Sequence, residues 1–146
     1  MTCDTSVTAL KVFLVEDSIP VRRRMVSLLS AIEGVEIAGE AEEAFAALAA
    51  IAAMKIDVAI VDLRLTASTG MEVVAALARL HPEVTTIVLT NHADSSFREA
   101  CMAAGAHHFF DKTSEFQLAR DTIEKLARER AACAVQERGA HHVWRR

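Results

Sequence analysis

Polar residues that could carry out chemistry recur directly after short apolar segments of this 146-residue chain. They are two adjacent acids, a third acid, a threonine and a lysine: Glu16, Asp17, Asp62, Thr90 and Lys112. Clustered carboxylates repel one another unless a hard cation joins them, and Mg²⁺ suits a few carboxylates together with a phosphoryl oxygen. A carboxylate can also attack a phosphoryl group, whose charge a hydroxyl and an ammonium can stabilise. These residue types therefore predict Mg²⁺-dependent phosphoryl chemistry if the fold brings them together.

Asp62 is the most informative of these residues because of the segment before it. The stretch 56–65 is apolar and rich in β-branched side chains up to Asp62, which is typical of a strand buried on both faces. A carboxylate inside an apolar sheet is costly unless it is paired, hydrogen-bonded or bound to a metal. At the carboxyl end of a parallel strand it would instead lie in the crevice where α/β proteins bind ligands. We therefore predict that Asp62 is the reactive carboxylate.

Strand-like apolar runs alternate with helical patterns along the chain. The predicted strands cover residues 12–15, 35–39, 56–65, 84–89 and 107–110. The predicted helices cover residues 20–33, 42–54, 71–80, 95–104 and about 114–137. This alternation indicates an α/β fold in which a parallel sheet carries helices on both faces. In such a doubly wound sheet the carboxyl ends of the strands meet at one rim, so the five polar residues should lie close together.

The ends and faces of two helices can be predicted in more detail. Apolar residues at helical spacing predict the buried stripe of the first helix: Val21, Met25, Leu28 and Ile32. The three arginines at 22–24 lie largely off this stripe. Asp94 or Ser95 can cap the fourth helix, and Gly105 is a typical C-terminal stop.

The overall composition suits one compact domain. Hydrophobic residues make up 52% of the chain and charged residues 25%, which argues against disorder. The net charge is -4, and residues 120–146 are basic while the remainder is acidic. An acidic body suits a cation site and gives no support for direct DNA binding. The three cysteines are widely separated, so we expect neither a disulfide framework nor a zinc site.

No segment of the sequence indicates secretion or membrane insertion. The first six residues lack the basic stretch and apolar run of a signal peptide. The longest apolar tract, 44–54, is about half as long as a membrane span. We therefore expect a cytoplasmic protein without a membrane partner.

The order of these motifs resembles the receiver domain of two-component response regulators over about residues 9 to 128. The matching segments are residues 13–18, residues 61–65 with Gly70, residues 88–90 and residues 105–112. The intervals between Asp17, Asp62, Thr90 and Lys112 are also similar to those of that family. The resemblance implies a flavodoxin-like fold of five parallel strands in the order 2-1-3-4-5 with five helices. Residues 1–8 would be an N-terminal tail, and residues 129–146 an extension of the last helix with a basic tail.

The resemblance also implies a phosphoacceptor and a metal site. Asp62 would accept a phosphoryl group from a sensor histidine kinase or a histidine phosphotransfer protein. Asp17, Asp62 and the backbone carbonyl of Arg64 would hold Mg²⁺, and Glu16 would contribute through a water molecule.

Further residues take roles in phosphotransfer and signalling by the same resemblance. Thr90 and Lys112 would bind phosphoryl oxygens. On phosphorylation Thr90 would move toward the phosphate, and Phe109 would swing inward as the aromatic switch. Phe109 has no hydroxyl, so it cannot form the hydrogen bond that a tyrosine could form there. Arg64 and His92 would flank the site and influence how fast the acyl phosphate hydrolyses.

Three functions fit these residues. The first is a single-domain response regulator that signals to an unknown output protein through its fourth helix, fifth strand and fifth helix. The second is a phosphorelay intermediate or phosphate sink without an output surface. The third is an Mg²⁺-dependent phosphatase with an aspartyl nucleophile, which is disfavoured because haloacid-dehalogenase-like enzymes have an Asp-x-Asp motif and residue 64 is Arg. We therefore expect a phosphoacceptor signalling domain rather than an enzyme.

The last predicted helix suggests a further partner. Its apolar residues lie near one stripe: Phe116, Ile123, Leu126 and Ala134. A second copy of the chain could pair along this stripe, although the first half of the helix must also pack on the sheet. A homodimer through the last helix is therefore an additional hypothesis. A DNA-binding regulator would need a further domain after residue 137.

Overall fold

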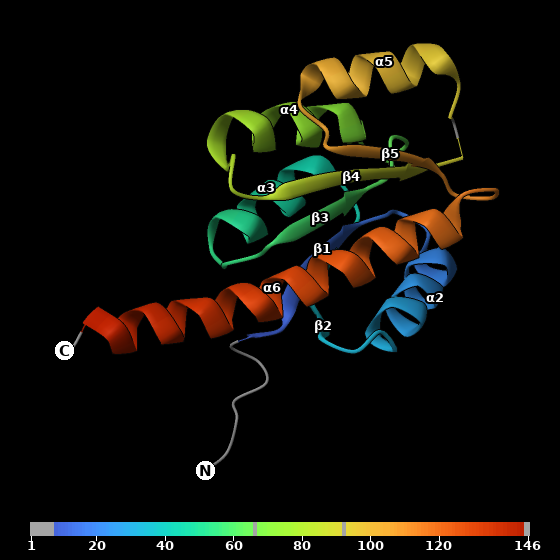
Figure 1. Ribbon diagram of the computed structural model, residues 1–146. Helices are drawn as coiled ribbons and strands as arrows, with labels where there is room; N and C mark the ends of the chain where they lie inside the picture. Colours follow the sequence, from blue (N-terminus) through green and yellow to red (C-terminus); the bar gives the residue numbers. More distant parts are fainter. Residues whose placement is uncertain (1–7, 66, 92, 145–146) are drawn as a thin grey trace.

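The computed structural model describes residues 8–65, 67–91 and 93–144, with side chains described up to Cys133. Its five parallel strands form one sheet in the order β2-β1-β3-β4-β5 (Figure 1). The strands are β1 (Leu10–Val15), β2 (Val35–Ala41), β3 (Val58–Val61), β4 (Thr85–Thr90) and β5 (His108–Asp111). The helices are α2 (Ile19–Ser30), α3 (Ala44–Ala52), α4 (Gly70–Leu80), α5 (Ser95–Ala104) and α6 (Phe116–Trp144). The predicted fold class and strand order are confirmed.

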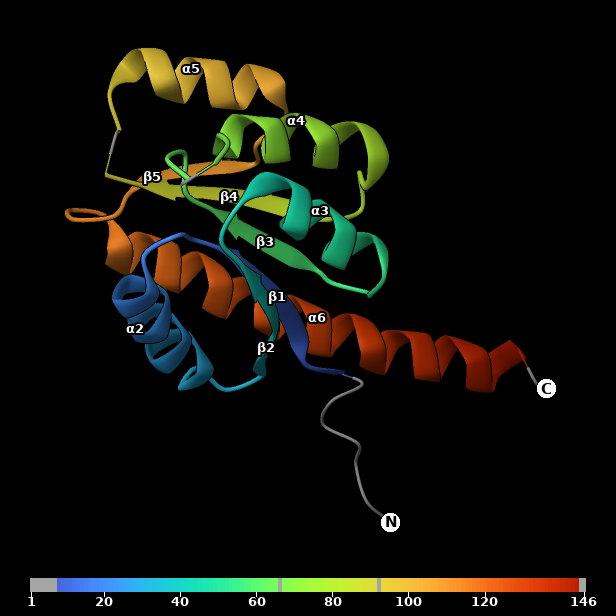
Figure 2. The same ribbon diagram turned by 180° about the vertical axis from the view of Figure 1, so that it is seen from behind.

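Helices cover both faces of the sheet. Helices α2 and α6 lie on one face, while α3, α4 and α5 lie on the other (Figures 1 and 2). The interior strand β1 divides its side chains between two cores. Val12 and Leu14 pack toward α2 and α6, and Phe13 and Val15 pack toward α3. Such apolar burial is the main favourable contribution to folding. The two cores hold β1 and β3 rigidly, and therefore also the residues that follow them.

The third strand is shorter than the apolar stretch that predicts it. Strand β3 ends at Val61, not at residue 65. Leu63 and Leu65 nevertheless remain buried, at 8% exposure each, because the loop after the strand turns its apolar side chains back into the core. An apolar pattern alone does not distinguish a strand from a loop that packs inward.

The first helix begins as predicted, but it ends at Ser30, three residues earlier than predicted, and buries a different leucine. Ser18 caps α2 by accepting a hydrogen bond from the Val21 N–H, and Pro20 occupies its first turn. The prediction for Leu28 is wrong, since its side chain is 41% exposed whereas that of Leu29 is 1% exposed. The packed face follows Met25 and Leu29, which are four residues apart and hence neighbours on one side of the helix.

The fourth predicted helix begins and ends as expected, whereas the fifth is longer than expected. Asp94 caps α5 through a 3.0 Å hydrogen bond from the Phe97 N–H, and Gly105 ends this helix with a φ of +117°. That backbone conformation favours glycine. Helix α6 continues to Trp144, beyond the predicted end near residue 137.

The division into a domain at 9–128 and an extension at 129–146 stays a prediction, and most of the predicted tail at 1–8 lies outside the described residues.

The described helices do not include a membrane span. None of them combines the length and the apolar character that crossing a bilayer requires.

A histidine on the edge strand β5 has a lowered pKa in the folded protein. His108 is half-buried, and its ring stacks on that of Phe110 with centroids 6.0 Å apart. Burial lowers the pKa of His108, and the charges of His107 and Lys125 lower it further. The folded protein therefore disfavours the protonated ring relative to the unfolded chain, whose histidines titrate near about 6.5.

We predict that the free energy of unfolding decreases as the pH is lowered through about 6.5, and levels off below the pKa of folded His108. Urea denaturation at a series of pH values measures this dependence. The variant His108→Gln should lose part of the decrease because it has no titrating ring. An identical pH dependence in the variant and the wild type would contradict the prediction.

Candidate functional site

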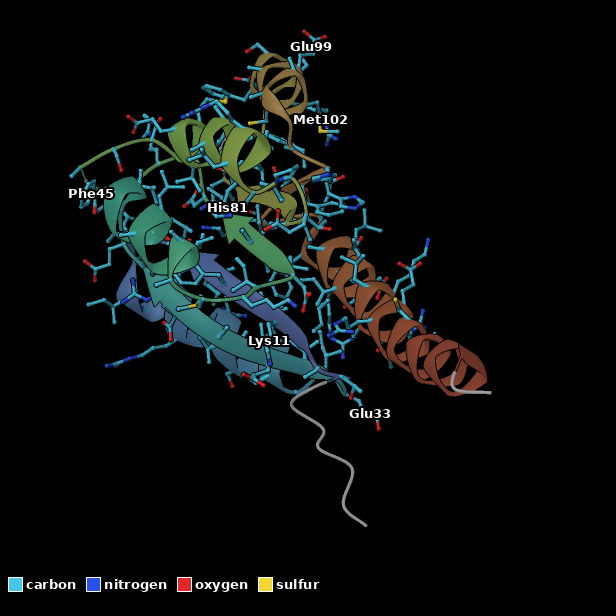
Figure 3. All side chains as sticks on the ribbon, turned by 90° about the vertical axis from the view of Figure 1, so that its left-hand side faces the viewer. Lys11, Glu33, Phe45, His81, Glu99 and Met102 are labelled. Atoms are coloured by element: carbon cyan, nitrogen blue, oxygen red, sulfur yellow. The ribbon has the colours of Figure 1, made fainter. Side chains whose placement is uncertain are left out.

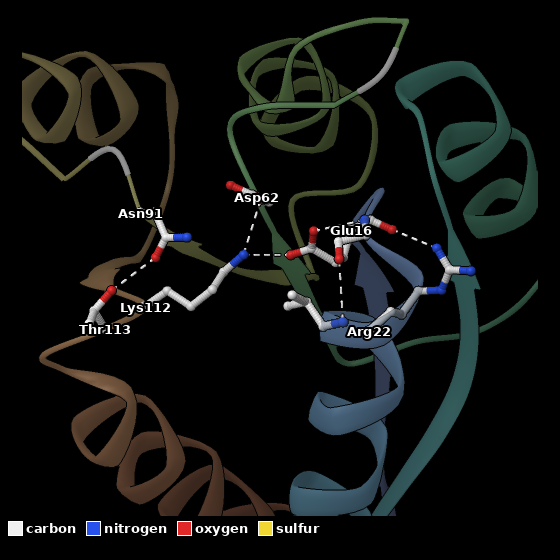
Figure 4. A network of polar contacts seen from close by, with 8 residues as sticks. Glu16, Arg22, Asp62, Asn91, Lys112 and Thr113 are labelled. Carbon is white, nitrogen blue, oxygen red and sulfur yellow. Dashed lines mark hydrogen bonds and ion pairs between the residues drawn. The ribbon is translucent and has the colours of Figure 1, made fainter.

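The carboxyl ends of four neighbouring strands bring the predicted polar residues to one edge of the sheet. Glu16 and Asp17 follow β1, Asp62 follows β3, Thr90 ends β4 and Lys112 follows β5. The parallel registers Val15↔Val61 and Val61↔Val88 align the ends of β1, β3 and β4. Figure 4 shows Glu16, Asp62 and Lys112 pointing toward one another across this edge.

Three carboxylates form the acidic part of the site. One carboxylate oxygen from each of Glu16, Asp17 and Asp62 lies within 4.8 Å of the others. Glu16 and Asp62 are buried, at 2% and 9% exposure. Asp62 Oδ1 is buried and has no hydrogen-bond partner among the described residues. Because a buried oxygen without a partner is costly, the donor set fits a hard cation such as Mg²⁺.

Lys112 lies between two of these acids. Its Nζ atom is 2.6 Å from Glu16 Oε1 and 3.1 Å from Asp62 Oδ2. The second oxygen of Glu16, Oε2, accepts a hydrogen bond from the Ser18 N–H at 3.1 Å. Both oxygens of Glu16 are thus engaged by the protein, whereas Asp62 uses only one of its oxygens in this way.

Burial and ion pairing together shift the pKa values of Lys112 and Glu16. Burial alone disfavours the charged ammonium of Lys112, but the hydrogen bond to Glu16 and the charges of Asp62 and Glu16 outweigh it, so the pKa of Lys112 is raised. Burial raises the pKa of Glu16, and the bonds from Lys112 and the Ser18 N–H oppose this only in part. Lys112 is therefore a cation at neutral pH and compensates the charge of the acids beside it.

The loop after β3 fixes the backbone next to Asp62. The Gly70 N–H donates to the Leu63 carbonyl at 2.9 Å, and Arg64 forms an isolated bridge with Thr69. A Cβ atom at Gly70 would lie 2.0 Å from the Asp62 carbonyl oxygen, so only glycine permits this close approach. The side chain of Arg64 itself is exposed.

The remaining predicted residues lie around this centre. Thr90 is fully buried, and its carbonyl accepts a 2.8 Å hydrogen bond from the Lys112 N–H. Phe109 is 3% exposed, and the guanidinium of Arg98 lies over its ring, 4.9 Å from the centroid. Arg98 also pairs with Glu115 at 3.6 Å, which links α5 to the start of α6. His92 lies outside the described residues.

Three contacts of polar residues near the site were not predicted from the sequence. Arg22 Nη1 donates to the Glu16 carbonyl at 2.6 Å. The Thr113 hydroxyl donates to Asn91 Oδ1 at 3.0 Å, which joins the loops after β4 and β5. Arg98 covers the Phe109 ring. No local pattern in the sequence identifies these contacts, because each of them joins separate elements.

Comparison with known proteins shows which family this sequence matches. The family model of the response regulator receiver domain matches residues 12–124. The DNA-binding transcriptional activator DevR/DosR of Mycobacterium tuberculosis is 31% identical over 131 residues, which cover 86% of this chain and 60% of that protein. The response regulator GacA of Pseudomonas aeruginosa is 29% identical over 103 residues, which cover 70% of this chain and 48% of that protein. The chain thus spans about half to three fifths of these relatives.

A solved structure shares the fold. A CheY-like response regulator receiver domain protein from Methanospirillum hungatei superposes with a TM-score of 0.71 at 21% identity. The match covers 84% of this chain and 96% of that one. At this level of identity the comparison supports the arrangement of strands and helices.

We predict that Gly70→Ala destabilises the protein by about 1–3 kcal/mol, because an added methyl group must displace backbone beside Asp62. Equilibrium unfolding in urea measures the loss. Ala75→Ser adds one atom at an exposed position of the same helix and serves as the control. Equal stabilities of Gly70→Ala and the control would show that the loop accepts a side chain at residue 70.

Proposed function

Because this chain belongs to the response regulator receiver domain family, we propose that Asp62 accepts a phosphoryl group from a phosphohistidine on a sensor histidine kinase or a histidine phosphotransfer protein. One observation carries the proposal. Asp62 is a buried carboxylate at the end of β3 that shares Lys112 with Glu16 through one oxygen, while Oδ1 has no hydrogen-bond partner among the described residues. A carboxylate placed in this way is suited to act as a nucleophile.

The bond changes of the transfer involve Asp62 and the phosphohistidine of the donor. One oxygen of Asp62 forms a bond to phosphorus while the P–N bond of the phosphohistidine breaks. The bonding electrons leave with the imidazole nitrogen, and the product on this chain is an acyl phosphate. Lys112, 3.1 Å from Asp62 Oδ2, compensates the negative charge of the transferring group. Thr90 at the end of β4 would supply a hydroxyl donor to a phosphoryl oxygen.

Three acidic side chains and one backbone carbonyl would hold Mg²⁺. Asp17 and Asp62 would bind it directly, together with the backbone carbonyl of Arg64. Glu16 would contribute through a water molecule, in keeping with its two oxygens already binding Lys112 and the Ser18 N–H. When bound, Mg²⁺ supplies positive charge that offsets the repulsion between the acids and the incoming phosphoryl group.

The signal would pass through Thr90 and Phe109 to a protein partner. Contacts of the phosphoryl group with Thr90 that exist only in the active arrangement would shift the population toward that arrangement. The partner would bind the predicted fourth helix, fifth strand and fifth helix, which are α5, β5 and α6. Phe97, Met102 and Leu118 are 43%, 44% and 51% exposed on these helices, and Figure 3 shows Met102 pointing away from the body. An output partner would contact these apolar side chains, whereas a phosphate sink requires no such contact.

The packing of α6 restricts which of its residues could form a homodimer contact. Ile123 lies in the core, and Phe116 and Leu126 pack against the same core cluster. The side chain of Ala134 lies outside the described residues. A homodimer along the predicted stripe would therefore have to use residues other than Phe116, Ile123 and Leu126. Light scattering on the protein with and without a phosphate mimic measures its mass, and a single-chain mass in both states would rule the homodimer out.

We predict that Asp62→Asn abolishes Mg²⁺-dependent labelling by a small phosphodonor such as acetyl phosphate, because an amide cannot form the acyl phosphate. Intact-mass spectrometry detects the added phosphoryl group, and circular dichroism checks the fold. Asp57→Asn removes an acid just before the other end of the same strand and should still be labelled. Phosphoryl label retained on Asp62→Asn would mean that another residue is the acceptor.

A further inference from the structure

A single arginine beside the acidic group holds the backbone that carries two of its three carboxylates. Arg22 lies in the first part of α2, and its side chain is 14% exposed. Its Nη1 atom donates to the Glu16 backbone carbonyl at 2.6 Å, a contact visible in Figure 4. Nε lies 2.9 Å from Glu40 Oε1, and Nη2 lies 3.4 Å from Glu42 Oε1. The guanidinium thus links α2, the end of β1 and the end of β2.

We infer that Arg22 is a positioning residue for the metal and phosphoryl site, acting through the peptide between Glu16 and Asp17. This inference rests on the proposed function. The Glu16 N–H still pairs with the Ala41 carbonyl at 3.0 Å, as a continuation of the β1–β2 pairing. The Glu16 carbonyl instead accepts from Arg22. Because a peptide group is planar, a fixed carbonyl also fixes the direction in which the chain enters Asp17.

The geometry of the guanidinium explains why an arginine suits this place. Its planar group presents several N–H donors in a rigid fork, so one side chain can bind a carbonyl and two carboxylates at once. Glu40 and Glu42 restrain the fork from the β2 side. A lysine would present one compact ammonium on a flexible stem, which cannot hold these three partners in the same directions.

The charge of Arg22 and its positioning of the peptide between Glu16 and Asp17 have opposite effects on Mg²⁺ affinity. A cation near an acidic site repels Mg²⁺, so removal of the charge alone would strengthen metal binding. Loss of the fixed peptide would weaken metal binding, because a group that orients the ligands typically contributes about 10–100-fold to affinity. Glu40 and Glu42 also partly neutralise Arg22. The sign of the change in Mg²⁺ affinity therefore separates the two effects.

The chain offers a matched control in the next residue. Arg23 lies on the same helix and carries the same charge, but its side chain is exposed. Arg22→Met and Arg23→Met make the same chemical change, and methionine retains the apolar stem. We expect Arg22→Met to weaken Mg²⁺ binding about 10-fold, with Arg22→Lys between it and the wild type. Arg23→Met should bind Mg²⁺ as tightly as the wild type, or slightly more tightly.

Isothermal titration with Mg²⁺ measures these affinities directly on the whole chain. Labelling by acetyl phosphate at low and at saturating Mg²⁺ provides a second readout. A positioning role predicts that Arg22→Met is labelled slowly at low Mg²⁺, and that saturating Mg²⁺ restores most of the rate. Circular dichroism verifies that each variant is folded. If Arg22→Met does not fold, the Mg²⁺ affinity of Arg22→Lys is compared with that of Arg23→Met instead.

The outcomes distinguish this inference from the proposed function. If the wild-type protein neither binds Mg²⁺ nor is labelled, the proposed function itself fails. If the wild type binds Mg²⁺ and the folded Arg22 variants bind it as tightly as Arg23→Met, the proposed function stands and the positioning role of Arg22 is overturned. Weaker binding by the Arg22 variants alone would support the role.

Discussion

Repulsion between three carboxylates at one end of the sheet is the constraint on which the site depends. Glu16, Asp17 and Asp62 bring oxygens within 4.8 Å of one another, which is unfavourable unless positive charge lies beside them. Lys112 provides one such charge, since its ammonium contacts both Glu16 and Asp62. Glu16 is satisfied by this pairing, whereas Asp62 keeps a buried oxygen without a hydrogen-bond partner among the described residues. This partnerless oxygen reduces the stability of the folded protein, and it also suits the site to bind a cation and a phosphoryl group.

The parallel sheet makes this cluster sterically possible. The strands β1 and β3 are neighbours, so the residues that follow them emerge side by side. Both strands are packed on two faces, which leaves little freedom for the positions of their ends. Helix α2, the loop ending at Gly70 and the start of α6 then orient the individual side chains. The core therefore sets where the acids lie, and contacts made by the loops and by Arg22 set their direction.

Local pattern and the family resemblance together predicted much of the fold, and the wrong predictions have physical causes. Strand order, the Asp94 cap and the Gly105 stop agree with expectation. The prediction for Leu28 is wrong by one residue, because the face of α2 that meets the sheet depends on how the helix is rotated when it packs. The third strand is shorter than the stretch 56–65 because apolar residues of its following loop also fill the core. Burial on its own does not specify backbone conformation.

The sequence alone determined which residue types end the strands and the order in which they occur, and these features suffice to indicate a receiver-like fold with Asp62 and Lys112 at one rim. Only the tertiary structure decided which atoms are partners. It selects Arg22 from three consecutive arginines to bind the Glu16 carbonyl, and it places Arg98 over Phe109. The reason is that such contacts join elements far apart in the chain. Their distances depend on how those elements pack, which local periodicity does not encode.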